Sequence, residues 1–151
     1  MLESDLLGQG RVLADVRINS KKRLLEFISD TLAQKNPELN SREIFDSLCR
    51  REVLGSTGLG KGVAIPHGRF SGIEGAEALF LRLSKPLPFD ADDEEPVDLI
   101  FAVGFPIECN EEQSKLLASI SERFSDPELQ AQLRAAADAS EIVQLLANAS
   151  A

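Results

Sequence analysis

The feature that most constrains the fold is the division of the chain into helical patterns at both ends and short apolar runs in the middle. Apolar residues recur at helical spacing over Leu24–Leu32 and Ile44–Cys49, and three further helical patterns occupy the last third. Between them, Ala78–Leu83 and Val97–Val103 are apolar enough to be interior strands. Because helices at both ends of a chain can cover both faces of a sheet, we expect an α/β domain with three α/β/α layers.

Local signals mark where the elements begin and end. An alternating run at Val12–Ile18 predicts a first strand, and Asn40 with Glu43 predicts a capping box for the second helix. Asp126-Pro127 predicts a helix start, whereas the glycine-rich stretch Gly55–Gly62 predicts a loop. The expected order is one strand, two helices, about three strands and three helices. The 151 residues suit a single domain covering 1–151.

The charge and hydropathy of the chain exclude several classes of partner. The formal net charge is -9, so phosphate backbones and anionic lipid are repelled and a basic protein surface is the better partner. No apolar run approaches the roughly 20 residues that span a bilayer, and residues 1–10 do not resemble a signal peptide. We therefore expect a cytoplasmic protein that binds no nucleic acid and does not insert into a membrane.

The two cysteines suggest neither a metal site nor a disulfide. Cys49 and Cys109 stand apart, outside any CxxC pair and without a cluster of histidines. We expect both to be free thiols in a reducing compartment, and we expect the protein to use no metal and no cofactor.

The glycine-rich stretch invites a nucleotide-binding interpretation, which its context does not support. Gly55, followed after four residues by Gly60-Lys61, matches the beginning of a P-loop. The next residue, which should be the Ser or Thr that holds magnesium, is Gly62. The stretch also follows a predicted helix and leads into an apolar run closed by Pro66, whereas a P-loop follows a strand and opens a helix.

His67, the single histidine of the chain, is the best candidate for a reacting group. It lies between Pro66, which fixes the local backbone, and Gly68, which lets another molecule come close. An imidazole nitrogen is nucleophilic near neutral pH because its ordinary pKa is about 6.5. Phosphoryl transfer to it requires positive charge and N–H donors around the phosphoryl oxygens. Candidate donors are Arg51, Lys61 and Arg69 for charge, and Ser56, Thr57 and Gly58 for hydrogen bonds.

A hydrolytic site is the competing interpretation of the same histidine. His67 could work with Ser56, Cys49 or Cys109 as the nucleophile, but the chain has no nucleophile-elbow motif. Several other short polar residues could be nominated equally well. The residues therefore favour a phosphocarrier over a hydrolase.

The stretch Gly55–Gly68 (GSTGLGKGVAIPHG) resembles the active-site signature of the mannitol/fructose-type enzyme IIA domains of the bacterial phosphotransferase system. Ser20–Glu26 and Glu95–Ala102 resemble the flanking segments of the nitrogen-regulatory branch of that family, enzyme IIA-Ntr. The resemblance covers nearly the whole chain. It implies an α/β/α sandwich with a small mixed sheet and a phosphotransferase component that carries a covalent phosphohistidine.

The resemblance also implies roles for individual residues and partners. His67 would carry the phosphoryl group on Nε2, and Arg51 would be the active-site arginine. An HPr-like phosphocarrier protein (NPr) would be the donor, and regulatory protein targets in nitrogen and potassium metabolism would respond. Many family members have a second active-site histidine where this chain has Gln113. Glutamine can donate a hydrogen bond but cannot become cationic, which puts the transfer rate in question.

Two other functions stay open within the family. One is a sugar-specific enzyme IIA that feeds a fructose- or mannitol-type permease, and the other is a binding module that no longer transfers phosphate. For the phosphocarrier we expect a pocket around His67 that is ready for an anion, with Arg51 within reach. We also expect an apolar rim for docking the donor, made by Leu59, Ile65 and Phe70.

Overall fold

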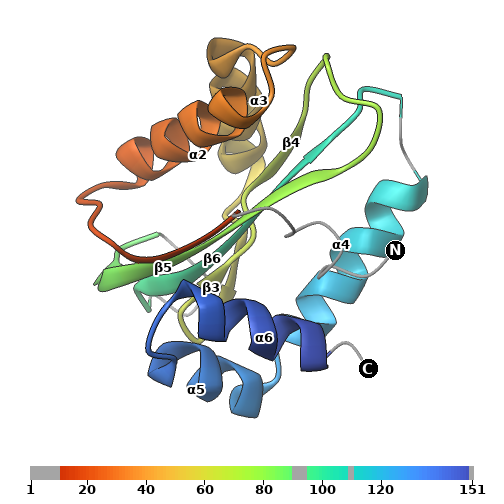
Figure 1. The fold of residues 1–151 in the computed structure, drawn as a ribbon. Helices are drawn as coiled ribbons and strands as arrows, with labels where there is room; N and C mark the ends of the chain where they lie inside the picture. Colours follow the sequence, from red (N-terminus) through yellow and green to blue (C-terminus); the bar gives the residue numbers. More distant parts are fainter. Residues whose placement is uncertain (1–10, 90–94, 109–110, 150–151) are drawn as a thin grey trace.

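The computed structural model describes residues 11–89, 95–108 and 111–149. The helices of these ranges are α2 (Lys21–Lys35), α3 (Ser41–Leu54), α4 (Glu111–Phe124), α5 (Pro127–Ala135) and α6 (Ala139–Ala149). The strands are β1 (Val12–Val16), β2 (Gly58–Gly60), β3 (Val63–Ala64), β4 (His67–Arg69), β5 (Glu77–Leu87) and β6 (Val97–Phe105). Helices α2 and α3 lie on one side of the sheet and α4, α5 and α6 on the other, which confirms the predicted α/β/α layers (Figure 1).

The sheet is mixed, and its strand order places β4 beside the central strand β6. The order is β1-β5-β6-β3-β2, with β5 and β6 antiparallel and β1 parallel to β5. Along the other edge of β6, β3 pairs with Leu99 and Ile100, and β4 pairs with Val103–Phe105, both in parallel. Between these two short strands the N–H of Val103 donates to the carbonyl of Pro66 at 2.9 Å. The short strands β3 and β4 thus pair one after the other along the same side of β6, and His67 begins the second of them.

Side chains of the central strands alternate between two cores, as the period of a strand requires. Leu79 and Ile100 pack under α2 and α3, whereas Phe80 and Phe101 pack under α4, α5 and α6. Phe101 meets Phe124 of α4 with ring centroids 5.1 Å apart. Burial of both sheet faces explains why β5 and β6 read as nearly continuous apolar runs in the sequence.

Four of the described helices begin at side-chain caps that satisfy N–H groups of the first turn, and at α6 the carboxylate of Asp138 accepts from the N–H of Glu141. Ser20 accepts from the N–H of Arg23, and Asp126 caps α5 ahead of Pro127. Asn40 accepts from the N–H of Glu43 at 3.1 Å, but the predicted capping box is only half formed. The carboxylate of Glu43 instead accepts from the N–H and the hydroxyl of Ser71, which fastens the start of α3 to the segment after β4.

The prediction for the middle of the chain was wrong in one respect. The stretch expected as a plain loop, Gly55–Gly62, contains β2, which forms a hairpin with β3 through residues with positive φ at Gly60, Lys61 and Gly62. The described part of the middle therefore has the five strands β2 to β6 instead of about three. The expected strand before Pro66 is present as β3, whereas β2 and β4, with three residues each, are too short to show a period of two and were not predicted.

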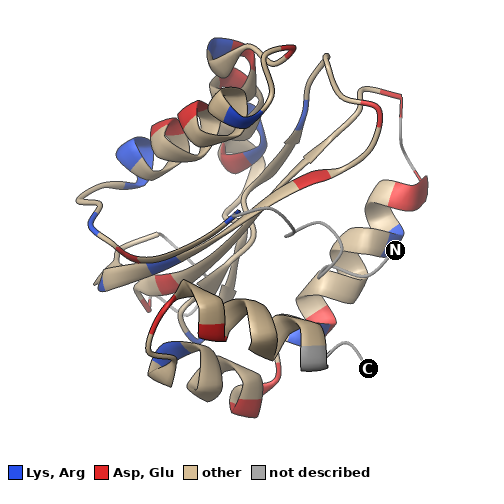
Figure 2. Cartoon of the chain, in the orientation of Figure 1, with Lys and Arg blue, Asp and Glu red and all other residues tan. Residues whose placement is uncertain are grey.

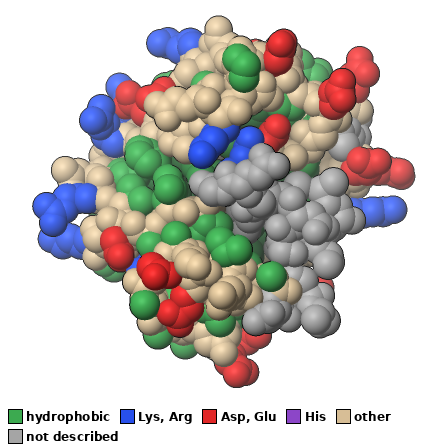
Figure 3. Space-filling model, viewed as in Figure 1, with side chains coloured by type: hydrophobic (Ala, Val, Ile, Leu, Met, Phe, Trp, Pro, Cys, Tyr) green, Lys and Arg blue, Asp and Glu red, His purple; other side chains and the backbone are tan. Residues whose placement is uncertain are grey.

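Charged residues gather on the helices and the connecting segments, and the long central strands carry few of them (Figure 2). On the face seen in Figure 3, acidic and basic side chains are interspersed around exposed hydrophobic groups. Cys49 has a free thiol, and Cys109 lies outside the described residues. Within the described ranges, none of the helices combines the length and the apolar character needed to cross a membrane.

Candidate functional site

The position of His67 is fixed by the short strand that it begins. Its backbone pairs with Val103 at the edge of β6, and Pro66 precedes it at the strand start, where the missing N–H of proline is tolerated. Gly68 is buried against α3, where a Cβ atom would lie only 2.4 Å from Oγ of Ser47. The same Oγ accepts from the N–H of Arg69 at 2.8 Å. The strand can approach α3 this closely because residue 68 has no side chain.

The two ring nitrogens of His67 have different partners, and these partners determine the tautomer. Nδ1 lies 2.9 Å from the carbonyl oxygen of Ile65, which can only accept, so Nδ1 carries the proton. Nε2 lies 3.2 Å from Nε of Arg51, which can only donate, so Nε2 presents its lone pair. The nitrogen that the resemblance implied as the phosphate carrier is thus the nucleophilic one. The prediction that Arg51 lies within reach of His67 is confirmed.

The surroundings keep the ring of His67 neutral. Burial lowers the pKa of His67 below its ordinary value, and the positive charge of Arg51 lowers it further. The hydrogen bond to the carbonyl of Ile65 and the negative charge of Glu52 oppose this lowering of the pKa. Because burial is the largest contribution, the unprotonated nucleophilic form dominates at neutral pH.

Arg51 is held in place by its own helix end. It lies in the last turn of α3, and Nη1 donates to the carbonyl oxygen of Gly55 at 2.9 Å. A cation is favourable at this end because the last carbonyls of a helix lack partners within it. With Nη1 engaged by Gly55, Nε is aimed at His67.

Glu52, the residue after Arg51, organises the segment that follows α3. Its side chain is 6% exposed and forms an ion pair with Lys21 at 2.9 Å. It also accepts from the backbone N–H and the hydroxyl of Thr57. Lys21 in turn donates to the carbonyl of Phe89 and lies 4.4 Å from the centroid of its ring. Helices α2 and α3 are thereby joined to the segment that precedes β2.

The residues predicted to bind phosphate have partners inside the protein. The hydroxyl of Ser56 donates to the carbonyl of Phe89 at 3.3 Å and accepts from the N–H of Gly58 at 3.1 Å. Thr57 is 5% exposed, and its N–H and hydroxyl both donate to Glu52. A contact of these hydroxyls, or of the N–H groups of Thr57 and Gly58, with a phosphate requires an exchange of partners, so the phosphate-binding role of the three residues stays a prediction.

Gln113 lies in the first turn of α4, on the side of the sheet opposite to α3. Its Oε1 accepts from Nε of Arg69 at 2.6 Å, and Arg69 is two residues after His67 on β4. The structure therefore brings Gln113 to the site through Arg69. The sequence named both residues but gave no indication that they are in contact.

The predicted apolar rim was largely wrong. Leu59 is 41% exposed, but Ile65 and Phe70 are core residues with exposures of 3% and 1%. Ile65 packs in the core under α4, α5 and α6, and Phe70 packs in the core under α2 and α3. The exposed apolar side chains next to the site are instead Val53 and Leu54, at 85% and 84%, in the last turn of α3. The sequence could have indicated Val53 and Leu54, because these two apolar residues do not continue the apolar stripe of the predicted helix.

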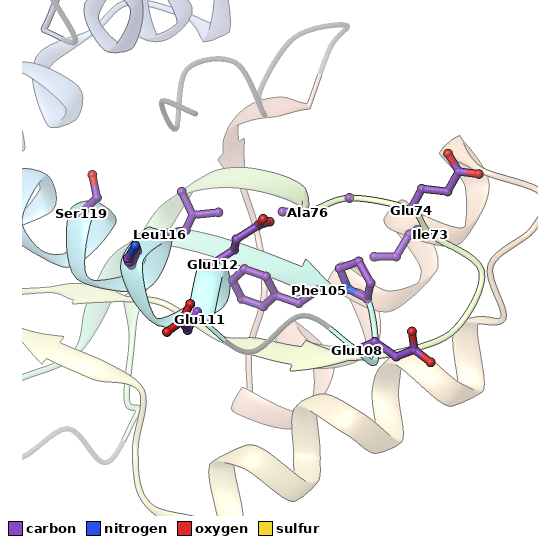
Figure 4. Close-up of a pocket in the computed structure, with 12 residues that line it drawn as sticks. Ile73, Glu74, Ala76, Phe105, Glu108, Glu111, Glu112, Leu116 and Ser119 are labelled. Atoms are coloured by element: carbon purple, nitrogen blue, oxygen red, sulfur yellow. The ribbon is translucent and has the colours of Figure 1, made fainter.

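A separate groove of about 970 Å³ runs beside α4, and neither His67 nor Arg51 lines it. Phe105, Ala76 and Leu116 form its apolar part, and Glu108 and Glu111 lie toward its edges (Figure 4). Among the described residues, no three His, Cys, Asp or Glu side chains are grouped as metal ligands.

The chain belongs to a known family of phosphotransfer proteins. The sequence model of the family described as "Phosphoenolpyruvate-dependent sugar phosphotransferase system, EIIA 2" matches residues 5–149. This family membership makes the chain an enzyme IIA component of that system, as its signature around His67 indicated.

Within the family, the chain is similar to nitrogen regulatory proteins. It is 40% identical to that of Pseudomonas aeruginosa, covering 93% of this chain and 92% of the relative. It is 37% identical to that of Escherichia coli K12, covering 95% and 88%. The crystal structure of IIA-Ntr from Neisseria meningitidis matches with a TM-score of 0.88 at 36% identity, over 95% of this chain and 98% of that one. These relatives indicate a regulatory role in the phosphotransferase system.

Proposed function

We propose that this chain is a phosphohistidine carrier in which Nε2 of His67 accepts a phosphoryl group from an HPr-like protein. The single observation that carries the proposal is the pair of contacts on the imidazole ring. The carbonyl of Ile65 binds the Nδ1 proton, and Arg51 directs an N–H at the lone pair of Nε2. The nucleophilic atom and a cation that can bind phosphoryl oxygens are therefore side by side before any donor arrives.

The transfer needs little proton movement. The lone pair of Nε2 forms the new N–P bond while the N–P bond of the donor breaks and its electron pair returns to the donor nitrogen. The proton on Nδ1 of His67 stays in place, so the phosphorylated ring is cationic and is stabilised by the carbonyl of Ile65 and the charge of Glu52. The N–H of Arg51, which first points at the lone pair of Nε2, then donates to a phosphoryl oxygen and forms a charge-assisted hydrogen bond.

Docking of the donor is proposed at the exposed apolar residues Val53, Leu54 and Leu59. They flank Arg51 and the segment that precedes β3, and such side chains next to a reacting group are typical of a protein-binding surface. The net charge of -9 favours a basic partner surface around this apolar contact.

The regulatory role is proposed to concern nitrogen and potassium metabolism in the cytoplasm, through protein targets that respond to the phosphorylation state of His67. The nitrogen regulatory relatives at 37–40% identity support this role. The sugar-specific alternative is weaker, because the 2-O-alpha-mannosyl-D-glycerate-specific EIIABC component of E. coli is 28% identical and the match covers 20% of its length.

The test is phosphotransfer from phosphoenolpyruvate through enzyme I and the HPr-like carrier, read by intact mass. Wild type should gain one acid-labile phosphoryl group, and His67→Ala should gain none while keeping the circular dichroism of the wild type. Phosphorylation of His67→Ala would refute the assignment. An unphosphorylated wild type that still binds a regulatory target would support the binding module, and a selective growth defect on fructose or mannitol after gene deletion would support the sugar-specific function.

A further inference from the structure

The contact between Arg69 and Gln113 links the reacting strand to α4 across the edge of the sheet. Nε of Arg69 donates to Oε1 of Gln113 at 2.6 Å, and the backbone N–H of Arg69 donates to Ser47 of α3 at 2.8 Å. Arginine can only donate, so the carbonyl oxygen of the Gln113 amide faces the guanidinium and the NH₂ group is directed away from it. Gln113 therefore binds Arg69 through Oε1, an atom that can accept a hydrogen bond but cannot donate one to a phosphate.

Strand geometry places Arg69 and His67 on one face of β4. Residues i and i+2 of a strand point to the same side and are separated by about 7 Å. The intervening Gly68 is buried, whereas His67 is half-buried and Arg69 is exposed, as this alternation requires. A phosphoryl group on Nε2 of His67 would extend into the space that the long side chain of Arg69 can reach.

We propose that Arg69 is the second cationic ligand of the phosphoryl group on His67, and that Gln113 is a positioning residue that acts through Arg69. Arg51 contacts His67 from the end of α3, and Arg69 lies two residues after His67 on β4, so the two cations come from different elements. The hydrogen bond to Gln113 occupies Nε and leaves the two terminal nitrogens for phosphoryl oxygens. This inference rests on the proposed phosphorylation of His67.

The electrostatics support the same assignment. Within the described residues, carboxylates form ion pairs with several basic side chains, among them Arg11, Lys21, Arg42, Arg82 and Arg134. Among the described residues, the side-chain partner of Arg69 is the neutral amide of Gln113, and Arg69 is in none of these ion pairs. The planar guanidinium of Arg69 can supply positive charge and paired N–H donors to phosphoryl oxygens at the place where many family members have a second histidine.

The experiment compares Arg69→Gln, Arg69→Lys, Gln113→Ala and the Arg69→Gln/Gln113→Ala double variant. Lys85→Gln, which removes an exposed cation from β5, controls for net charge. Each protein is phosphorylated in parallel by the phosphorylated HPr-like carrier and by phosphoramidate, a small donor that needs no docking surface. The initial rate and the lifetime of the phosphohistidine at neutral pH are measured, and circular dichroism checks the fold.

Loss of a charge-assisted contact predicts that Arg69→Gln is slower by about 10- to 100-fold with both donors. Gln113→Ala should be slower by a smaller factor, and the double variant should be no slower than Arg69→Gln alone because Gln113 acts through Arg69. Arg69→Lys should retain part of the rate. Lys85→Gln should match the wild type.

Three results would overturn the proposal. An Arg69→Gln rate within twofold of the wild type with both donors would mean that the contact with Gln113 only fastens α4 to β4. A defect confined to the protein donor would mean that Arg69 serves docking, and multiplying defects in the double variant would mean that Gln113 acts independently. A wild type that accepts phosphate from neither donor would overturn the carrier function itself, whereas a normal wild type beside a normal Arg69→Gln would overturn only the role of Arg69.

Discussion

The substitution Glu52→Gln tests whether the ion pair beside the site stabilises the fold. Glutamine keeps the shape of the side chain and can still accept from Thr57, so the change removes the charge that faces Lys21. At 2.9 Å the gross attraction is about 6 kcal/mol for an effective dielectric constant of about 20, and most of it is offset by desolvation. The side chains of Glu52 and Lys21 are 6% and 24% exposed, between a surface pair and a buried one.

We therefore expect Glu52→Gln to lower the free energy of unfolding by about 2 kcal/mol, which corresponds to a Tm lower by about 4–8 °C for a chain of this size. The matched control is Asp46→Asn, which breaks the exposed pair with Arg42 and should cost less than about 0.5 kcal/mol. Both are measured by thermal and urea unfolding, with Lys21→Met completing a double-mutant cycle. A loss from Glu52→Gln no larger than that from Asp46→Asn would refute the reasoning.

Two further predictions concern His67 and its strand. In an NMR titration the single imidazole should show a pKa below about 6.5, and Glu52→Gln should lower this pKa further. The folded state binds this proton more weakly than the unfolded state, so the free energy of unfolding should fall as the pH drops from above about 6.5 through the lowered pKa of His67. A measured His67 pKa of about 6.5 or higher would contradict this prediction. Gly68→Ala should cost about 1–3 kcal/mol in urea unfolding, because its Cβ would meet Oγ of Ser47 at 2.4 Å. The control Gly75→Ala has no atom within 4 Å of the added Cβ and should be nearly neutral, so equal effects of the two substitutions would disprove the steric argument.

The layers of the fold were predictable because each rests on a local pattern. The apolar stripe of α2 and the cap at Asp126 are properties of neighbouring residues, and they place helices correctly. The apolar runs of β5 and β6 predicted buried strands, because a strand covered on both faces has few polar positions. Strand β2 was missed because a three-residue strand exists only through its pairing, here with β3, which in turn pairs with β6.

At the candidate site, the sequence singled out the residues but did not show which of them are in contact. His67 stood out as a single histidine between Pro66 and Gly68, and Arg51 followed from the family signature. Glu52 and Ser47 gave no signal, since their importance lies in contacts with residues distant in the chain. Ile65 and Phe70 were misassigned to a docking rim because the sequence does not show which side of a short strand faces a core.

The sequence by itself thus determined the number of layers and the family and singled out His67 as the candidate nucleophile, because these depend on residue type and on spacing along the chain. Tertiary structure decided which nitrogen of His67 carries the proton, through the carbonyl of Ile65 and the guanidinium of Arg51. It also decided that Gln113 meets Arg69, by bringing the first turn of α4 to the end of β4. Hydrogen bonds and burial join residues that are far apart in the chain, and their geometry exists only once the strands have paired and the helices have packed.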